Sequence, residues 1–313
     1  MPHNNLVIPE FLKPGSKVAI VAPAGRVFAH ELDFALHWLR EKEWIPVLDE
    51  SCFVQYDFGY KYAGDVLHRL QRLQTVLDSE EIDAIWCARG GYGCIHLVDN
   101  LEVARFLDKP KWLIGYSDIT VLHNWLNNLG VASLHAVTAK RILPEQGEVV
   151  YDSMHSMLSG KLQDKHWAYH TKNQLGSARG RLVGGNLSLL YSQLGSKTAL
   201  QQDNIILFLE DWKENWYHLD RMMMALKRSG LFSRLQAVIV GSFTQMDVPE
   251  ENPAYSYNFD EVAEQILSLH LESLDIPVAF GCKAGHIVEN YAMMMGVEVE
   301  LSVSKSSSIL KYL

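Results

Sequence analysis

The 313-residue chain is poor in the features that mark several classes of protein. It has four cysteines and no C-x-x-C pair, which argues against a zinc cluster or a disulfide framework. It contains no H-E-x-x-H motif, and no apolar run approaches the roughly 20 residues of a membrane span. The formal net charge is −9, and no block rich in Lys and Arg interrupts this acidic balance. We therefore expect no metal, and neither nucleic acid nor a membrane as a partner.

The N-terminal segment does not have the pattern of a secretory signal. Pro2, Pro9 and Pro14 interrupt the region where a charged part and an apolar part would lie. The cysteines fit the pattern of buried thiols. We expect a cytoplasmic protein.

Strands and helical stripes alternate along the first half of the chain. Residues 17–23 (KVAIVAP) form an apolar, β-branched run without polar alternation, which is typical of a strand covered on both faces. Further strands are predicted at residues 45–48, 84–87 and 111–115, with amphipathic stripes before and after them. This rhythm predicts a doubly wound α/β domain with a mostly parallel sheet.

The second half repeats the strand-and-helix rhythm with shorter signals. Strands are predicted at residues 205–209, 237–240 and 277–280, and residues 292–301 end in the alternation of a terminal strand. The apolar pattern thins between Ile142 and Gly176. We predict an N-terminal domain over residues 1–150, a linker over 151–175, and a C-terminal α/β domain with additional strands over 176–313.

Three polar residues lie just beyond predicted strands: Ser117 after KWLIGY, Glu210 directly after IILFL, and His286 after PVAF by a glycine-flanked loop. Ligands and catalytic groups gather beyond the carboxyl ends of strands in open α/β sheets. The order serine, acid, histidine is that of the α/β-hydrolases, although G-Y-S-D-I lacks the second glycine of G-x-S-x-G. A serine hydroxyl must lose its proton to a base as it attacks, and a carboxylate behind an imidazole fixes the tautomer that accepts this proton.

Each of these residues also has a simpler interpretation. Ser117 is equally placed to cap a helix, and Glu210 to be a solvated strand end. His286 is one of 13 histidines, and His123 and His135 compete with it. Only their joint placement favours a catalytic triad.

Two glycine-rich stretches could approach a ligand closely. Residues 87–93 (CARGGYG) follow a strand, and their N–H groups could form an anion nest or an oxyanion hole, unless the stretch is only a tight connection. The stretch fails the dinucleotide pattern G-x-G-x-x-G because His96 stands where a glycine is needed. In residues 180–188 (GRLVGGNLS), Asn186 and Ser188 could bind a substrate or cap the following helix.

These segments together resemble the LD-carboxypeptidase family of serine peptidases, whose relatives include the microcin immunity peptidases. The resemblance covers nearly the whole chain. It runs through LKPGSKVAIVAPAG (12–25), IDAIWCARGGYG (82–93), KWLIGYSDITVLH (111–123), GRLVGGNLSLL (180–190), FLEDWKENWYHLDRM (208–222) and FGCKAGH (280–286).

The resemblance implies a role for each candidate residue. Ser117 matches the family nucleophile, Glu210 the triad acid and His286 the base, while the backbone N–H groups of Gly91 and Asp118 match the oxyanion donors. It also implies a homodimer that needs no cofactor and acts on a small peptide. The chain departs from the family where Ala136 follows His135, and in residues 287–296, where family members have a proline-bearing turn.

The leading hypothesis is a serine carboxypeptidase that releases terminal D-alanine from murein tetrapeptide, a step of cell-wall recycling. One alternative is a hydrolase of microcin-type peptidyl-nucleotide antibiotics, with aromatic residues in 167–169 stacking on a base. Another is a non-catalytic α/β ligand-binding module. A free terminal carboxylate calls for a cation, for which Arg89 and Arg181 are candidates.

Overall fold

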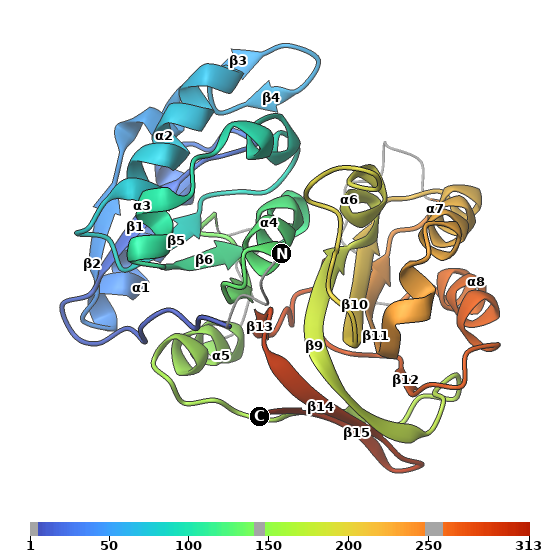
Figure 1. Ribbon diagram of the computed structural model, residues 1–313. Helices are drawn as coiled ribbons and strands as arrows, with labels where there is room; N and C mark the ends of the chain where they lie inside the picture. Colours follow the sequence, from blue (N-terminus) through green and yellow to red (C-terminus); the bar gives the residue numbers. More distant parts are fainter. Residues whose placement is uncertain (1–5, 141–147, 248–258) are drawn as a thin grey trace.

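The computed structural model describes residues 6–140, 148–247 and 259–313. The part of the predicted domain boundary at residues 142–147 lies outside these ranges. The chain forms two α/β lobes, each built around its own sheet (Figure 1). The α/β fold with two domains is therefore confirmed, with a mostly parallel sheet in the first and a mixed sheet in the second.

The N-terminal sheet has six strands in the order β13-β7-β6-β5-β1-β2. All neighbouring pairs are parallel except β13 with β7. The strands are β1 (Lys17–Val21), β2 (Ile45–Leu48), β5 (Ala84–Cys87), β6 (Trp112–Gly115), β7 (Ser133–His135) and β13 (Met293–Met295). The four residues of β5 and of β6 are all buried, as an apolar strand covered on both faces requires.

Helices connect these strands and cover the sheet. They are α1 (Asp33–Glu41), α2 (Val66–Asp78), α3 (Ala104–Asp108) and α4 (Thr120–Asn128). Helix α2 begins where the Asp65 carboxylate accepts the N–H of His68, and it buries one face through Leu73 and Leu77. A short hairpin of β3 (Tyr56–Asp57) and β4 (Lys61–Tyr62) projects beside α2 (Figure 1).

The C-terminal sheet has seven strands in the order β12-β11-β10-β9-β14-β15-β8. Strands β9 to β12 pair with one another in parallel, whereas β14 is antiparallel to β9 and to β15, and β15 is antiparallel to β8. These strands are β8 (Lys165–Ala168), β9 (Gly176–Asn186), β10 (Ile205–Trp212), β11 (Leu235–Thr244), β12 (Val278–Ala279), β14 (Glu298–Val303) and β15 (Ser307–Tyr312). Its helices are α6 (Leu187–Ser192), α7 (Trp216–Arg228) and α8 (Glu261–Leu271), and α5 (Glu148–Leu158) precedes β8.

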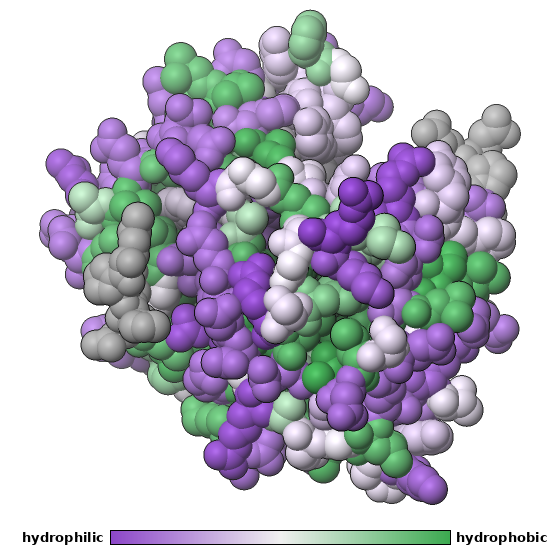
Figure 2. Space-filling view, turned by 45° about the vertical axis from the view of Figure 1, so that its right-hand side comes forward, coloured by the Kyte–Doolittle hydropathy of each residue, from purple (hydrophilic) through white to green (hydrophobic). Residues whose placement is uncertain are grey.

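The two lobes are joined by more than the linker. Strand β13 comes from the C-terminal part of the chain but pairs with β7 of the N-terminal sheet. Helix α4 lies against the start of the other lobe, where the hydroxyl of Thr120 accepts the N–H of Asn186 at 3.1 Å. On the face drawn in Figure 2, hydrophilic residues dominate and hydrophobic ones form smaller separate areas. Most apolar side chains are therefore buried. The contact of Thr120 with Asn186 holds the two lobes together near the end of β6.

Candidate active site

Ser117 occupies a strained turn at the carboxyl end of β6. The backbone at Tyr116 is extended, whereas Ser117 has φ +64°, in the left-handed region that residues other than glycine rarely adopt. Ser117–Ile119 forms one 3₁₀ turn that leads into α4. The N-cap positions of this turn and of α4 are Tyr116 and Ile119, so Ser117 itself is not the helix cap. A tight turn of this kind between a strand and a helix exposes the side chain of its first residue, here Ser117, above the sheet.

The glycine-rich loop after β5 lies directly beside this turn. A Cβ on Gly90 would stand 3.3 Å from Ser117 Oγ, so the absent side chain leaves room for the hydroxyl. Gly91 follows with φ +105° and faces the hydroxyl of Tyr60. The predicted oxyanion donors, Gly91 and Asp118, therefore lie on two adjoining segments.

The side chain of Asp118 joins these two segments. It is fully buried, and its Oδ2 accepts the N–H of Cys94, just beyond the glycine loop, at 2.8 Å. Burial raises the pKa of Asp118, while the N–H donors of the loop oppose that rise. A buried polar contact of this kind holds the loop and the serine turn as one unit.

His286 and Glu210 form a buried pair on the other side of the site. Glu210 is in β10 and completely buried, and its Oε2 lies 2.7 Å from His286 Nδ1. Burial by itself raises the pKa of Glu210 and lowers that of His286, but the charge and the hydrogen bond of the partner outweigh it. The pKa of Glu210 consequently lies below its usual value and that of His286 above.

Two aromatic rings fix the orientation of His286. The Trp212 ring stacks on the imidazole at 5.5 Å with an interplanar angle of 4°, and the Tyr116 ring lies 4.9 Å away. Because Tyr116 directly precedes Ser117, the imidazole contacts the segment that carries the serine. The structure therefore brings all three predicted triad residues to the same interlobe region.

Residues 280–291, here called the His286 loop, position the histidine through contacts of their backbone. Gly285 has φ +113°, and a Cβ there would meet Ser242 Oγ and stand 2.7 Å from Glu210 Oε2. The N–H of Gly285 donates to Asn290 Oδ1 at 2.8 Å, and the hydroxyl of Thr244 donates to the carbonyl of His286 at 3.0 Å. Only glycine allows the loop to come this close to the acid.

The two competing histidines are buried in the N-terminal lobe. His123 uses both ring nitrogens, with Nδ1 2.8 Å from the Ser133 hydroxyl and Nε2 2.9 Å from the Gly115 carbonyl. Burial lowers the pKa of His123 to about 3 and that of His135 to about 4. Both imidazoles are therefore neutral at pH 7, and only His286 among the three is paired with a carboxylate.

Asn186 and Ser188 are engaged in structural contacts. Asn186 caps α6, and its Nδ2 donates to Asp211 Oδ1 at 2.9 Å. The Ser188 hydroxyl donates to Asn186 Oδ1 at 2.7 Å, and its N–H donates to Asp211 Oδ2 at 2.8 Å. Burial, with the charge of Glu210 beside it, raises the pKa of Asp211 to about 7, while its donors oppose that rise. Substrate binding by either residue stays a prediction.

The two candidate cations differ in their partners. Arg181 is ion-paired with Glu298 at 3.6 Å. Arg89 donates from Nη1 to the carbonyl of Arg26 at 3.2 Å, and its charge counteracts the rise that burial causes in the pKa of Tyr60. Arg89 is thus the cation near Tyr60, which itself faces Gly91. Trp167, one of the aromatic residues that the alternative function would use for base stacking, is largely buried, and its indole N–H donates to the Phe280 carbonyl at 2.9 Å.

Sequence reasoning missed three residues of the site: Tyr60, Asp211 and Trp212. Asp211 and Trp212 follow the predicted acid directly, so their position beside it was a usable signal. Tyr60 is in the turn between β3 and β4, far along the chain from both Gly91 and Ser117, and no periodicity points to it.

In the described part of the chain, no group of three or more His, Cys, Asp or Glu side chains could hold a metal ion. No helix there is long and apolar enough to cross a membrane.

Comparison with known proteins identifies the class to which this fold and site belong. Residues 18–136 match the model of the LD-carboxypeptidase N-terminal domain, and residues 179–301 match that of the LD-carboxypeptidase C-terminal domain. The chain therefore belongs to the LD-carboxypeptidase family, a family of serine-type peptidases.

Three individual proteins show which members of the family the chain is similar to. The chain is 30% identical to the murein tetrapeptide carboxypeptidase of Pseudomonas aeruginosa, with 90% of this chain and 91% of that one covered. It is 24% identical to the microcin C7 self-immunity protein MccF of Escherichia coli over 76% of each. Its fold matches the crystal structure of muramoyltetrapeptide carboxypeptidase from Oxalobacter formigenes with a TM-score of 0.82, at 22% identity and over 95% of this chain and 98% of that one.

Proposed function

We propose that this protein is a carboxypeptidase that releases terminal D-alanine from murein tetrapeptide through a Ser117-His286-Glu210 triad. The observation that carries the proposal is the 2.7 Å contact of Glu210 with His286, whose ring in turn contacts the residue before the strained Ser117. The named activity of the Pseudomonas aeruginosa relative supports the choice of substrate.

The chemistry follows from these positions. Glu210 accepts a hydrogen bond from the N–H at His286 Nδ1, which leaves Nε2 unprotonated as the base. Nε2 takes the hydroxyl proton as Ser117 Oγ attacks the carbonyl carbon of the bond to D-alanine. The negative charge formed on the carbonyl oxygen is stabilised by the N–H groups of Gly91 and Asp118.

The intermediate then collapses. The C–N bond breaks, and His286 returns its proton to the departing amine, so that D-alanine leaves and the peptide stays as an ester on Ser117. Water attacks this ester while His286 again accepts a proton, and its return to Ser117 Oγ releases the tripeptide acid. Arg89 is the candidate to hold the free carboxylate of the D-alanine residue. Asn186 and Ser188 are weaker candidates for substrate contacts.

Liquid chromatography with mass spectrometry of a murein tetrapeptide tests the proposal. The wild type should remove one alanine, and Ser117→Ala should lower kcat by about 10⁴- to 10⁶-fold because the nucleophile is gone. Ser192→Ala, a change of an exposed serine on α6, is the matched control and should leave turnover unchanged. Near-normal turnover by Ser117→Ala would exclude the triad.

The relation to the microcin immunity protein favours one second candidate, hydrolysis of a peptidyl-nucleotide compound. The same triad would act there, and the difference would be in substrate binding. Turnover of the tetrapeptide and of an aminoacyl sulfamoyl adenosine, measured side by side, separates the two candidates. A higher kcat/KM for the nucleotide compound would replace the murein assignment.

The setting of the reaction is part of the proposal. Release of D-alanine from murein tetrapeptide belongs to cell-wall recycling, for which we propose a cytoplasmic location. The homodimer implied by the family resemblance is also a prediction, and light scattering coupled to gel filtration measures it directly.

A further inference from the structure

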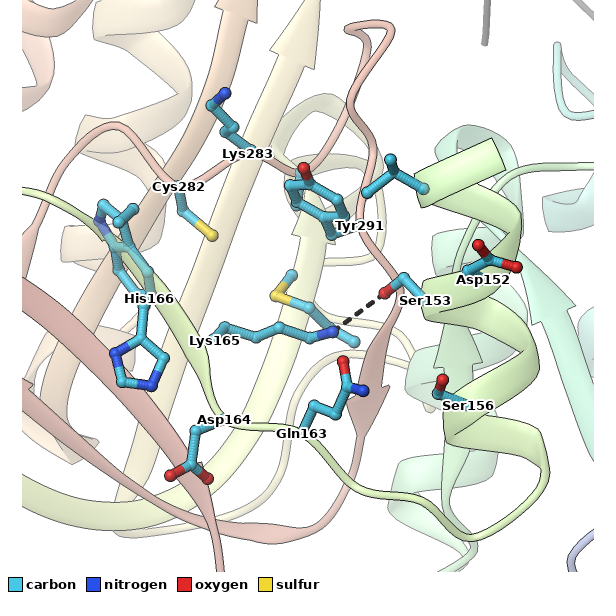
Figure 3. A pocket seen from close by; sticks show the side chains of 14 residues that line it. Asp152, Ser153, Ser156, Gln163, Asp164, Lys165, His166, Cys282, Lys283 and Tyr291 are labelled. Carbon is cyan, nitrogen blue, oxygen red and sulfur yellow. Dashed lines mark hydrogen bonds between the residues drawn. The ribbon is translucent and has the colours of Figure 1, made fainter. Parts of the chain in front are cut away.

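A separate cavity of about 350 Å³ lies where α5, β8 and the His286 loop meet (Figure 3). This volume is at the lower end of the range for small-molecule sites. Its lining comes from three parts of the chain: from α5, from the segment that leads into β8, and from the His286 loop with β13. None of the predicted triad residues lines it.

Lys165 places a cation inside this cavity. Figure 3 shows its side chain crossing the space, with Nζ donating to Ser153 Oγ at 3.0 Å. Within the described ranges of the chain, no carboxylate lies within 4.0 Å of this ammonium group. Burial lowers the pKa of Lys165 to about 8, so the amine is still mostly protonated at pH 7. A partly buried positive charge whose hydrogen-bond partner is a neutral hydroxyl is less well compensated than one paired with a carboxylate.

The neighbouring groups do not supply the missing negative charge. Cys282 points its sulfur toward the same space, but burial raises the pKa of this thiol to about 12, so it is neutral. Lys283 also lines the cavity, and it already pairs with Glu289 at 2.8 Å. The exposed carboxylate of Asp152 lies 3.7 Å from Lys42. Of the two lysines that line the cavity, Lys165 is therefore the one without a carboxylate within 4.0 Å among the described side chains, and that includes the neighbouring Asp164.

The remaining lining suits the rest of a small molecule. The amide of Gln163 lies beside Lys165 in Figure 3 and adds a second polar group. Trp167 and Met293 add apolar surface next to the neutral thiol of Cys282. The site thus combines one cation and a few hydrogen-bonding groups with an apolar wall, as small-molecule sites commonly do.

We propose that this cavity binds a small organic carboxylate, with the carboxylate group on Lys165 and Ser153 and the apolar part against Trp167 and Met293. One face of the site is the stretch of residues 282–284, which belongs to the His286 loop. An occupant would therefore contact the segment that positions His286 without entering the catalytic site. The inference does not depend on which peptide the enzyme cleaves.

Isothermal titration calorimetry of the full chain with 3-phenylpropanoate tests this site, with 3-phenylpropanamide as the uncharged match. We expect the carboxylate to bind at least about tenfold more tightly than the amide, since only the carboxylate forms the charge-assisted contact. Lys165→Met should weaken carboxylate binding at least about tenfold. Lys283→Met, a change of a lysine in the same cavity that has its own partner, should leave the Kd within about twofold.

A second variant guards against loss of folding in Lys165→Met. Ser153→Ala removes one hydroxyl and should weaken binding about threefold to tenfold, while thermal unfolding reports whether each variant is intact. Equal binding of acid and amide, or an unchanged Kd in a folded Lys165→Met, would overturn the proposal. So would binding that is lost in Arg89→Met instead, which would place the probe in the catalytic site. Inorganic phosphate bound as tightly as the carboxylate would show that the apolar wall contributes nothing, and would overturn the assignment to an organic acid.

Discussion

The two halves of the candidate active site depend on different structural features, backbone conformation in one and side-chain interactions in the other. On the N-terminal side, the serine turn and the glycine loop work through backbone shape: φ is +64° at Ser117 and +105° at Gly91. On the C-terminal side, the work is done by side chains, since Glu210 and His286 form a buried ionic pair under the Trp212 ring. The N-terminal half positions the serine and the glycine loop, whereas the C-terminal half sets the protonation state of His286.

This difference predicts distinct experimental signatures. Changes in the C-terminal half should move the pH dependence of the reaction, because the pKa of His286 is set there by Glu210. Changes in the N-terminal half should lower kcat and leave the pH dependence in place, because the charged groups that set the pKa of His286 are all in the other half. Four predictions test this contrast, and each could break it.

Glu210→Gln should have the largest effect. The amide no longer stabilises the imidazolium or selects the Nδ1–H tautomer, so kcat should fall by about 10⁴-fold. In the wild type, kcat/KM should rise with pH through the pKa of His286, which lies above its usual 6.5. Without the carboxylate, burial lowers the pKa of the imidazole and only the smaller effect of the Asp211 charge opposes it, so the rise should move to lower pH. A pH-rate profile of both proteins measures the shift, and an unmoved or upward-shifted acid limb would contradict the pairing.

Gly285→Ala should have the second largest effect, and Gly281→Ala is its control. Both positions have positive φ, +113° and +80°, so alanine should cost each about 1–2 kcal/mol of stability. Only at position 285 does the new methyl group meet Glu210 Oε2, whereas nothing lies within 4 Å at position 281. We expect kcat to fall about 100-fold in Gly285→Ala alone, because the acid and the histidine are displaced. Equal losses of activity in both variants would show that loop strain, and not the contact with Glu210, is what matters.

Much of this arrangement could be predicted from the sequence because it depends on local pattern. The apolar runs of β1, β5 and β6 are continuous since both faces are buried, and this indicates a parallel sheet. The carboxyl ends of parallel strands meet at one edge of a sheet, so residues that follow them come together even when they are far apart in the chain. This rule indicates Ser117 after β6 and Glu210 near the end of β10 as candidates, although the two strands belong to different sheets, so the contact between the lobes is not predicted by it.

Other features depend on contacts that no local pattern records. The sequence suggests that the glycine-rich stretch 180–188 could approach a ligand or cap a helix, but it does not predict that residues 180–186 are part of β9, an eleven-residue strand whose glycines interrupt any alternation of side chains. The run at 292–301 was expected to be one strand, and it divides into β13 and β14, which belong to different sheets. Residues 165–168, expected in the linker, form β8 because β15 offers it a free edge. Pairing partners of this kind are set by tertiary structure.

Asp118→Ala tests the N-terminal half and should have a smaller effect than the changes around His286. It leaves the N–H of Cys94 buried without its acceptor, so the glycine loop should shift relative to Ser117 and kcat should fall about 10- to 100-fold. Asp118→Asn keeps an acceptor oxygen and should stay within about threefold of the wild type. The acid limb of the pH-rate profile should be the same in all three proteins. A shifted limb would show that the carboxylate of Asp118 acts on His286, and that the two halves are not separate.

Tyr60→Phe should have the smallest effect and sharpens the contrast most. The Tyr60 hydroxyl faces Gly91, and burial raises its pKa, so it is neutral near pH 7 and can act only through a hydrogen bond. Its removal should lower kcat/KM about threefold, at the scale of one neutral hydrogen bond. Tyr56→Phe, on the exposed side of the same hairpin, should change nothing measurable. If Tyr60→Phe instead lost activity by two orders of magnitude, the phenol would be part of the chemistry, and stabilisation of the oxyanion would not come from backbone N–H groups alone.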